Sequence, residues 1–166
     1  MEMKTARLQL REMTGEDVDH LLEIFADPIA MQYYPSTKNR EQTKQWIEWN
    51  KRLYKQEGIG LWIVEDRKTS CFVGQCGLVP QEIQGEKRLE IGYLLSREQW
   101  GNGFATEAAQ ACRDYAFHVL EVAEVISIID IRNTPSINVA KRIGMKKEQQ
   151  LHIDNKQQFI FRIGAE

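Results

Sequence analysis

The sequence contains few of the residues that build disulfide scaffolds or metal sites. Its 166 residues include three cysteines and three histidines, and an odd number of thiols does not suggest a disulfide framework. Cys71, Cys76 and Cys112 lie in segments of core-like composition, so we expect reduced, buried thiols, as in a cytosolic protein. Because no cysteine or histidine cluster has the spacing of a zinc site, we expect no bound metal.

Long apolar runs and an excess of positive charge are also absent. The chain has no run of about 18 apolar residues, and its start, MEMKTARLQL, lacks the apolar core of a signal peptide, so we expect neither a membrane span nor export. The net charge of −2 argues against a general nucleic-acid binder but permits a small cationic substrate. Without a linker, repeat or low-complexity tract, residues 1–166 are expected to form one cytoplasmic domain.

Hydrophobic periodicity predicts both helices and strands along the chain. Strands are expected at 5–13, 61–66, 71–79, 89–95, 122–131, 145–153 and 158–163. Helices are expected at 14–26, 39–56, 105–120 and 133–144. The polar residues 81–87 are expected to form a turn, and Gly74 and Gly77 to mark bends or close backbone contacts. This order predicts an α+β domain with a mixed sheet of about seven strands flanked by about four helices.

The stretch from 89 to 107, LEIGYLLSREQWGNGFATE, carries the clearest functional signal. A strand with apolar residues at alternate positions leads into a loop with Gly101 and Gly103, and a helix begins directly afterwards. Glycine tolerates a positive φ, and the free N–H groups at a helix start favour a phosphate or diphosphate. The P-loop motif is missing, and the dinucleotide fingerprint fails at Thr106, where a third small residue is needed.

This loop is similar to the acetyl-CoA loop of the GNAT N-acetyltransferases, which has the pattern Gln/Arg-x-x-Gly-x-Gly/Ala. Trp100, Gly103 and Ala105 fall on the three marked positions, with Trp100 in place of the usual Gln or Arg. The segment from 133 to 145, NTPSINVAKRIGM, resembles the late motif of the same family, Asn-x-x-Ser-x-x-Val/Phe…Lys-x-Gly-Phe/Met. Within the family, Trp-Gly-x-Gly-aromatic-Ala-Thr-Glu-Ala resembles the branch that acetylates ribosomal-protein N-termini.

The resemblance implies a GNAT-like, mostly antiparallel sheet in which a central pair of strands splays apart. It also implies that acetyl-CoA is the acetyl donor, with its pantetheine arm in the opening between those strands and without a metal. The arm would pair with the backbone of Tyr93, Leu94 and Leu95. Asn133 would hydrogen-bond the arm or a nearby water, and Asn138 would reach the outer part of CoA. The diphosphate would rest on the N–H groups of Gly101, Asn102, Gly103, Phe104, Ala105 and Thr106.

Direct attack of an amine on the thioester needs a base, a donor for the oxyanion and an acid for the leaving thiolate. Glu90 is the expected base, with the alternative that it orders a water or binds a neighbouring strand. The family's usual acid is a tyrosine, and Ala140 occupies that position. Ser136 is the next candidate, with the alternative that it only caps the helix. The N–H of Leu94 or Leu95 is the oxyanion donor that the resemblance implies.

Three aromatic residues, Tyr33, Tyr34 and Trp62, are expected either to line the acceptor pocket or to pack the core and its rim. The acceptor stays open among a protein N-terminus, a polyamine, an amino sugar and another small amine. The leading hypothesis is an acetyl-CoA-dependent N-acetyltransferase. The alternatives are a non-catalytic acyl-CoA-binding or sensing module, which the missing tyrosine favours, and an interaction protein without enzymatic activity.

Overall fold

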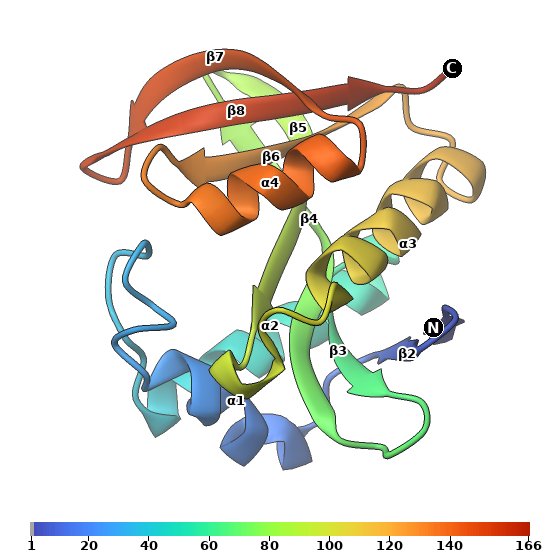
Figure 1. The fold of residues 1–166 in the computed structure, drawn as a ribbon, viewed down its shortest axis with the longest axis vertical. Helices are drawn as coiled ribbons and strands as arrows, with labels where there is room; N and C mark the ends of the chain where they lie inside the picture. The colour runs from blue at the N-terminus through green and yellow to red at the C-terminus, as the bar shows by residue number, and fades with distance from the viewer. Residues whose placement is uncertain (1) are drawn as a thin grey trace.

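The computed structural model describes residues 2–166, which form one sheet of eight strands. In chain order the strands are β1 (Glu2–Lys4), β2 (Leu8–Arg11), β3 (Leu61–Asp66), β4 (Phe72–Ile83), β5 (Glu86–Leu95), β6 (Glu124–Asp130), β7 (Lys146–Ile153) and β8 (Lys156–Gly164). Across the sheet they follow the order β1-β2-β3-β4-β5-β6-β8-β7. Figure 1 shows β6, β8 and β7 at the top of the view and β3 and β2 lower down. All neighbouring pairs are antiparallel except β5 and β6, so the expected mixed, mostly antiparallel sheet is confirmed.

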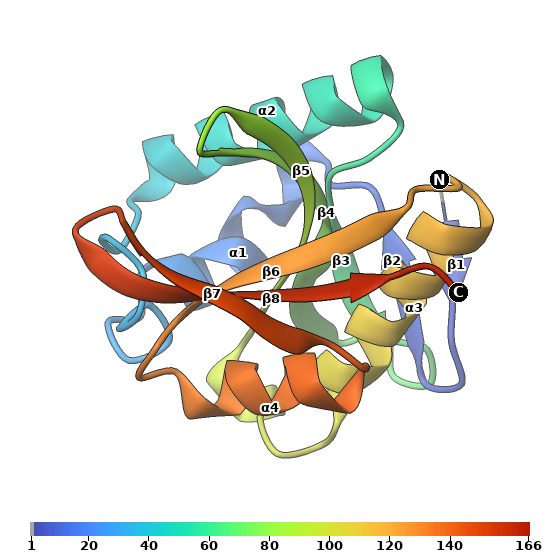
Figure 2. The same ribbon diagram turned by 90° about the horizontal axis from the view of Figure 1, so that it is seen from above.

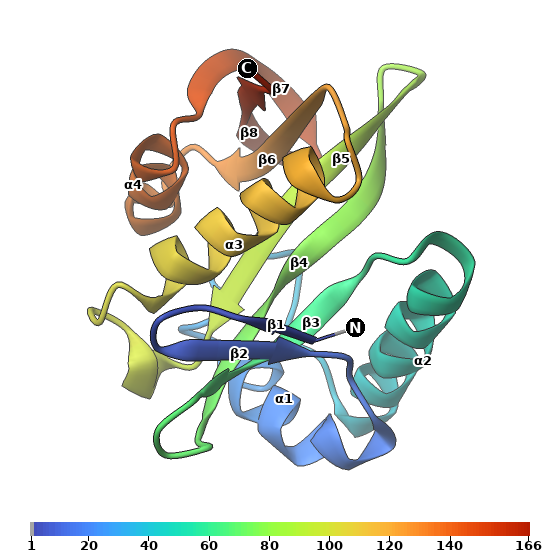
Figure 3. The ribbon, with the colours of Figure 1, turned by 90° about the vertical axis from the view of Figure 1, so that its right-hand side faces the viewer.

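Four α-helices and two short 3-10 helices accompany the strands in the described part of the chain. They are η1 (Gly15–Asp17), α1 (Val18–Phe25), α2 (Arg40–Glu57), η2 (Arg97–Gln99), α3 (Phe104–His118) and α4 (Thr134–Arg142). Helices α1 and α2 cover one face of the sheet and α3 and α4 cover the other, as Figures 2 and 3 show. A large apolar cluster lies between the sheet and each helix pair.

No helix within residues 2–166 combines the length and the apolar character that crossing a bilayer requires. No three or more His, Cys, Asp or Glu side chains there are grouped so that they could hold a metal ion.

The ends of α2 follow directly from its sequence. Asn39 Oδ1 accepts from the N–H of Gln42 at 2.8 Å, and Gln42 Oε1 accepts from the N–H of Asn39 at 2.9 Å. This reciprocal capping box fixes the start of the helix. Gly58 ends it with a φ of 69°, in the left-handed region that glycine adopts without strain. Between these ends, the indole of Trp46 donates to Gln75 Oε1 at 2.9 Å and ties the helix to β4.

Three local expectations were wrong. Strand β1 was not expected, because it is a short polar strand at the sheet edge with no apolar alternation. Residues 81–87 do not form a long turn, because β4 and β5 continue to a two-residue hairpin loop at Gln84 and Gly85, both with positive φ. Cys71 is exposed between β3 and β4, whereas Cys76 and Cys112 are buried with their sulfur atoms 3.6 Å apart.

The glycines of β4 do mark close backbone contacts, as expected. A Cβ atom on Gly77 would lie 2.0 Å from the carbonyl oxygen of Gly60. One on Gly74 would lie 2.5 Å from the carbonyl oxygen of Leu94. Because both contacts are with backbone atoms, no side chain can move to make room, and glycine is required where the chain passes this close.

The parallel pair at the centre of the sheet is largely unpaired. Strands β5 and β6 are in register only at Glu90 and Ile126. By contrast, β6 and β8 are in register over seven residue pairs, from Glu124 to Asp130 of β6. Beyond Glu90 and Ile126 the two strands separate towards their carboxyl ends, which confirms the expected splayed pair.

Candidate active site

Two side chains satisfy the backbone at the point where the β5–β6 ladder stops. In a continued parallel ladder, the N–H of Ile128 would donate to the carbonyl of Ile91. Instead, the Ile128 N–H donates to Glu90 Oε2 at 3.0 Å, and Ser127 Oγ donates to the Ile91 carbonyl at 2.8 Å. The Ile128 N–H and the Ile91 carbonyl therefore both keep a hydrogen-bond partner where the strands part.

Beyond this point, β5 presents backbone groups to the opening. Successive residues of a strand direct their N–H and C=O groups to opposite neighbours. Because the Ile91 carbonyl faces β6, the backbone groups of Tyr93 and Leu95 also face the opening, and those of Leu94 face β4. The Leu95 carbonyl accepts from Trp100 Nε1 at 3.0 Å. Of the two expected oxyanion donors, the N–H of Leu95 is therefore the one directed at the opening.

The loop after β5 turns at two glycines in the left-handed region. Gly101 has a φ of 81° and Gly103 a φ of 77°. None of the backbone N–H groups from 101 to 106 donates to another atom of residues 2–166. These groups lie at the positive end of the α3 dipole, next to a cavity of about 570 Å³ that also has Arg142 on its wall. The free N–H groups and the positive charge fit a diphosphate.

Most residues that the sequence assigns to acetyl-CoA binding line this larger cavity. They are Tyr93, Leu94, Leu95, Gly101, Gly103, Phe104, Ala105, Thr106, Asn133 and Asn138. Asn102 is the exception, because its carbonyl accepts from Arg7 Nη1 at 2.9 Å and its side-chain amide donates to the carbonyl of Gln99 at 3.1 Å. Asn102 therefore shapes the loop from the side that does not border the cavity.

A second cavity, of about 390 Å³, has Glu90 on its wall. Glu90 Oε1 accepts from Gln81 Nε2 at 2.8 Å, and Glu90 Oε2 accepts from the N–H of Ile128. Burial raises the pKa of Glu90 to about 7, although both hydrogen bonds favour the ionised form. A carboxyl group with this pKa can take up and release a proton near neutral pH, as a base for an ammonium group must.

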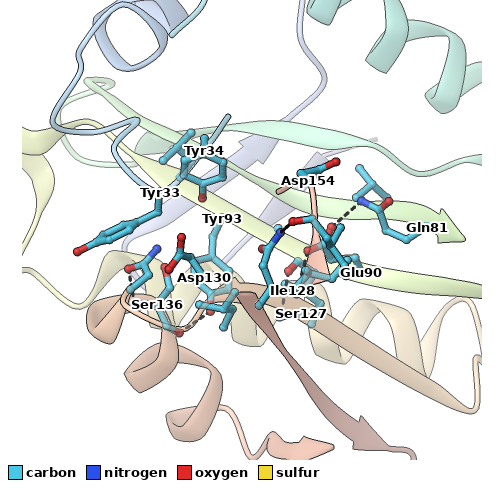
Figure 4. Close-up of a pocket in the computed structure, with 18 of the residues that line it drawn as sticks. Tyr33, Tyr34, Gln81, Glu90, Tyr93, Ser127, Ile128, Asp130, Ser136 and Asp154 are labelled. Carbon is cyan, nitrogen blue, oxygen red and sulfur yellow. Dashed lines mark hydrogen bonds between the residues drawn. The ribbon is translucent and has the colours of Figure 1, made fainter. Parts of the chain in front are cut away.

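The larger and smaller cavities meet, because they share lining residues. The shared residues are Tyr33, Tyr34, Tyr93, Leu94, Asn133 and Ser136. Figure 4 shows Glu90 and Gln81 at one end of the smaller cavity and Tyr33 and Ser136 at the other. Burial raises the pKa of Tyr34 to about 12, and the charge of Glu90 adds to this effect, so the phenol stays protonated. Ligands in the two cavities would meet beside the shared residues.

At this junction, the start of α4 is held from two sides. The hydroxyl of Tyr93 donates to the backbone carbonyl of Ser136 at 2.7 Å. Asn133 Oδ1 accepts from the N–H of Ser136 at 3.3 Å, so Asn133 caps the helix and Ser136 does not. The hydroxyl of Ser136 makes no hydrogen bond within residues 2–166. Ser136 thus borders both cavities with a hydroxyl that is available to a ligand.

Trp62 lies away from both cavities. Its side chain is fully buried on the face of the sheet that α3 covers, with its ring 5.6 Å from that of Tyr115 in an edge-to-face arrangement. It packs the core, so only Tyr33 and Tyr34 of the three expected aromatic residues border a cavity. Ala140 is also fully buried, so a tyrosine there would have to displace core residues.

Sequence reasoning missed three residues of the smaller cavity. Ser127 is only 1% exposed, and its signal was a lone serine inside the apolar run of β6. Gln81 was assigned to a turn, but it lies on β4 and orients Glu90. Asp130 ends β6, and hydrogen bonds from Arg132 hold the pKa of its carboxyl below the usual range. Ser127 and Gln81 are placed by partners on another strand, and Asp130 lies at the end of its own strand. Periodicity within the sequence identifies none of the three.

The opened parallel strand pair beside a helix start with free N–H groups leaves room for an extended ligand that carries a diphosphate. Residues 7–146 match the family model described as Acetyltransferase (GNAT) domain. The chain therefore belongs to the GNAT acetyltransferase family, and it is an acetyl-CoA-dependent acetyltransferase that acts on an amine.

The chain is similar to other proteins over nearly its whole length. "Uncharacterized protein YkkB" of Bacillus subtilis (strain 168) is 43% identical over 156 residues, which cover 93% of this chain and 91% of that protein. "Uncharacterized N-acetyltransferase p20" of Bacillus licheniformis is 33% identical over 148 residues, which cover 87% and 82%. The crystal structure of the acetyltransferase from Agrobacterium tumefaciens str. C58 superposes with a TM-score of 0.87 at 26% identity and covers 99% of this chain and 95% of that one.

Proposed function

We propose that the protein transfers the acetyl group of acetyl-CoA to a primary amine in the smaller cavity, by direct attack of the amine on the thioester. The junction of the two cavities at the β5–β6 opening carries this proposal. Glu90 lies on the acceptor side of the junction, and the free N–H groups of 101–106 lie on the donor side. The loop sequence WGNGFATEA further supports the branch that acetylates ribosomal-protein N-termini.

Acetyl-CoA supplies the reactive thioester carbonyl, and side chains and backbone of this protein supply the proton transfer and the oxyanion donor. An alkylammonium has a pKa of about 10 and no free electron pair, so the acceptor must lose a proton before it reacts. Glu90 accepts this proton through intervening water, because its pKa of about 7 keeps much of it ionised at neutral pH. The N–H of Leu95 stabilises the negative charge that develops on the carbonyl oxygen.

The leaving thiolate also needs a proton donor. Ala140 occupies the position of the family's tyrosine and has no acidic group. We assign this role to Ser136, because its hydroxyl borders both cavities and does not cap α4. Tyr93 fixes the backbone of Ser136 through its hydrogen bond to the carbonyl, so the hydroxyl is held beside the opening.

The lining of the smaller cavity suits an acceptor that is cationic in solution. Tyr33, Tyr34, Trp46 and Trp49 contribute aromatic faces, which attract cations. Glu90 adds a carboxylate at the far end. A protein N-terminus or a small-molecule amine has both the charge and the narrow reacting end that such a cavity accepts.

The second candidate function is a non-catalytic acyl-CoA-binding or sensing module, which the alanine at position 140 favours. Release of free thiol from acetyl-CoA, measured across a panel of amines, separates the two functions. Thiol release with any amine, at a rate that is lower in Glu90→Gln or Ser136→Ala than in the wild type, would support the transferase. CoA binding without turnover would support the module, and failure to bind CoA would contradict both.

A further inference from the structure

The connection between β1 and β2 lies against the start of α3, about a hundred residues later in the chain. Thr5 Oγ1 donates to Glu107 Oε1 at 2.8 Å, and the backbone N–H of Arg7 donates to the same oxygen at 2.9 Å. Arg7 Nε donates to Glu107 Oε2 at 2.7 Å. Glu107 lies in the first turn of α3, so these contacts fix the helix start to the edge of the sheet.

Arg7 also holds the glycine loop itself. Its Nη1 donates to the carbonyl of Asn102 at 2.9 Å, and its guanidinium carbon lies 4.6 Å from the centroid of the Phe104 ring. The Asn102 carbonyl and the Gly103 N–H belong to one planar trans peptide, so they point in opposite directions. With the carbonyl held on the Arg7 side, the Gly103 N–H points away from Arg7. Arg7 does not line the larger cavity, but Gly103 does.

The charges around the loop give Arg7 a second effect. Burial disfavours ionisation of Glu107, but hydrogen bonds from Arg7 and Thr5 outweigh it and hold the pKa of the carboxyl below the usual range. An ionised carboxylate in the first turn of α3 would repel a diphosphate bound at the same helix start. The guanidinium of Arg7, paired with that carboxylate, offsets this repulsion.

We propose that Arg7 is a positioning residue for the diphosphate of acetyl-CoA, which it does not touch. It turns the 102–103 peptide so that the Gly103 N–H faces the cavity, and it neutralises Glu107 beside the bound phosphates. This inference rests on the proposed function, because it takes acetyl-CoA as the ligand of the larger cavity.

A purely structural role for the pair is expected to be small. The side chain of Arg7 is 50% exposed and that of Glu107 is 16% exposed, and ion pairs near the surface contribute little to folding stability. Loss of Arg7 should therefore leave the thermal unfolding midpoint nearly unchanged, while it disturbs the orientation and charge of the loop.

The test compares two ligands that share one arm. CoA carries the diphosphate together with adenosine and a 3′-phosphate, and pantetheine has the same arm without any of these groups, so the ratio of their dissociation constants reports on the nucleotide diphosphate half of CoA. Titration calorimetry for CoA and NMR titration for pantetheine would be applied to the wild type, Arg7→Gln, Arg7→Lys and the control Arg40→Gln. Arg40 pairs with Asp19 on the exposed surface, with 57% and 79% of the two side chains accessible, and lines neither cavity.

We expect Arg7→Gln to raise the dissociation constant of CoA at least about tenfold. The dissociation constant of pantetheine and the thermal unfolding midpoint should not change. Arg7→Lys should recover part of the loss, because it keeps the charge but not the forked donor. Arg40→Gln should change neither ligand. Equal weakening of CoA and pantetheine in Arg7→Gln, or no weakening of either, would overturn the role of Arg7. A wild type that binds neither ligand would instead contradict the proposed function.

Discussion

Replacing Glu90 with glutamine tests the proton acceptor with little change of shape. The amide oxygen of glutamine can still accept from the Ile128 N–H, which Glu90 now accepts at 3.0 Å. Gln81, which donates to Glu90, can rotate its amide and accept from the new side chain. The variant therefore removes the group that titrates and retains the hydrogen bonds that border the opening.

The expected size of the effect follows from the proposed role. General-base catalysis contributes about 10²- to 10⁴-fold to a rate, so Glu90→Gln should lower kcat/KM for the amine by about 100-fold or more. In the wild type, kcat/KM should rise with pH through about 7, as Glu90 loses its proton. The variant should lose this inflection. Its affinity for CoA should not change, because Glu90 does not line the larger cavity.

Thiol release from acetyl-CoA, recorded as a function of pH, is the assay, with calorimetry of CoA binding to confirm that the variant is folded. Ser136→Ala provides the comparison, since it removes a hydroxyl on the same cavity wall and leaves Glu90 in place. Its pH profile should retain the inflection near pH 7. Wild-type activity in Glu90→Gln, or the same inflection in that variant, would show that Glu90 only supports the strand.

Three further outcomes concern stability. Because burial raises the folded-state pKa of Glu90 from 4.5 to about 7, ionisation opposes folding by roughly 3 kcal/mol above that pH. Wild-type stability relative to Glu90→Gln should therefore fall as pH rises between these values, and a pH-independent difference in urea unfolding would refute this. Ser127→Ala leaves the Ile91 carbonyl without its donor and should lower the free energy of unfolding by about 1–3 kcal/mol; an unchanged midpoint would contradict its role in the opening. Gly77→Ala would place a Cβ 2.0 Å from a backbone oxygen and should cost about 3 kcal/mol or more. Gly15→Ala meets no atom within 4 Å, and an equal loss there would refute the packing argument.

Much of the fold could be predicted because its signals are local. The helix expected at 39–56 is found at Arg40–Glu57, because the residues that end it, Asn39 and Gly58, are local signals. Strand β1 escaped detection because a polar edge strand is defined by its partner and not by its own periodicity. The exposure of Cys71 was missed for a similar reason, since a position next to a strand end can belong to the core or to the turn.

Some residues of the site could likewise be identified from the sequence, and others could not. The loop with Gly101 and Gly103 could be read from the sequence, because its backbone geometry requires glycine. The face on which Trp62 lies could not, because alternation gives two faces and does not say which one borders a cavity. Ser127 could not be identified either, since its partner is a backbone carbonyl 36 residues earlier in the chain.

The side chains of Glu90 and Ser127 keep β5 and β6 apart in the free protein. A ligand therefore does not have to break backbone hydrogen bonds between β5 and β6 before it enters the opening. Its association rate should be limited by diffusion and by the loss of its own flexibility. The opening between β5 and β6 is then present throughout the catalytic cycle, and turnover should need no movement of the two halves of the sheet relative to each other.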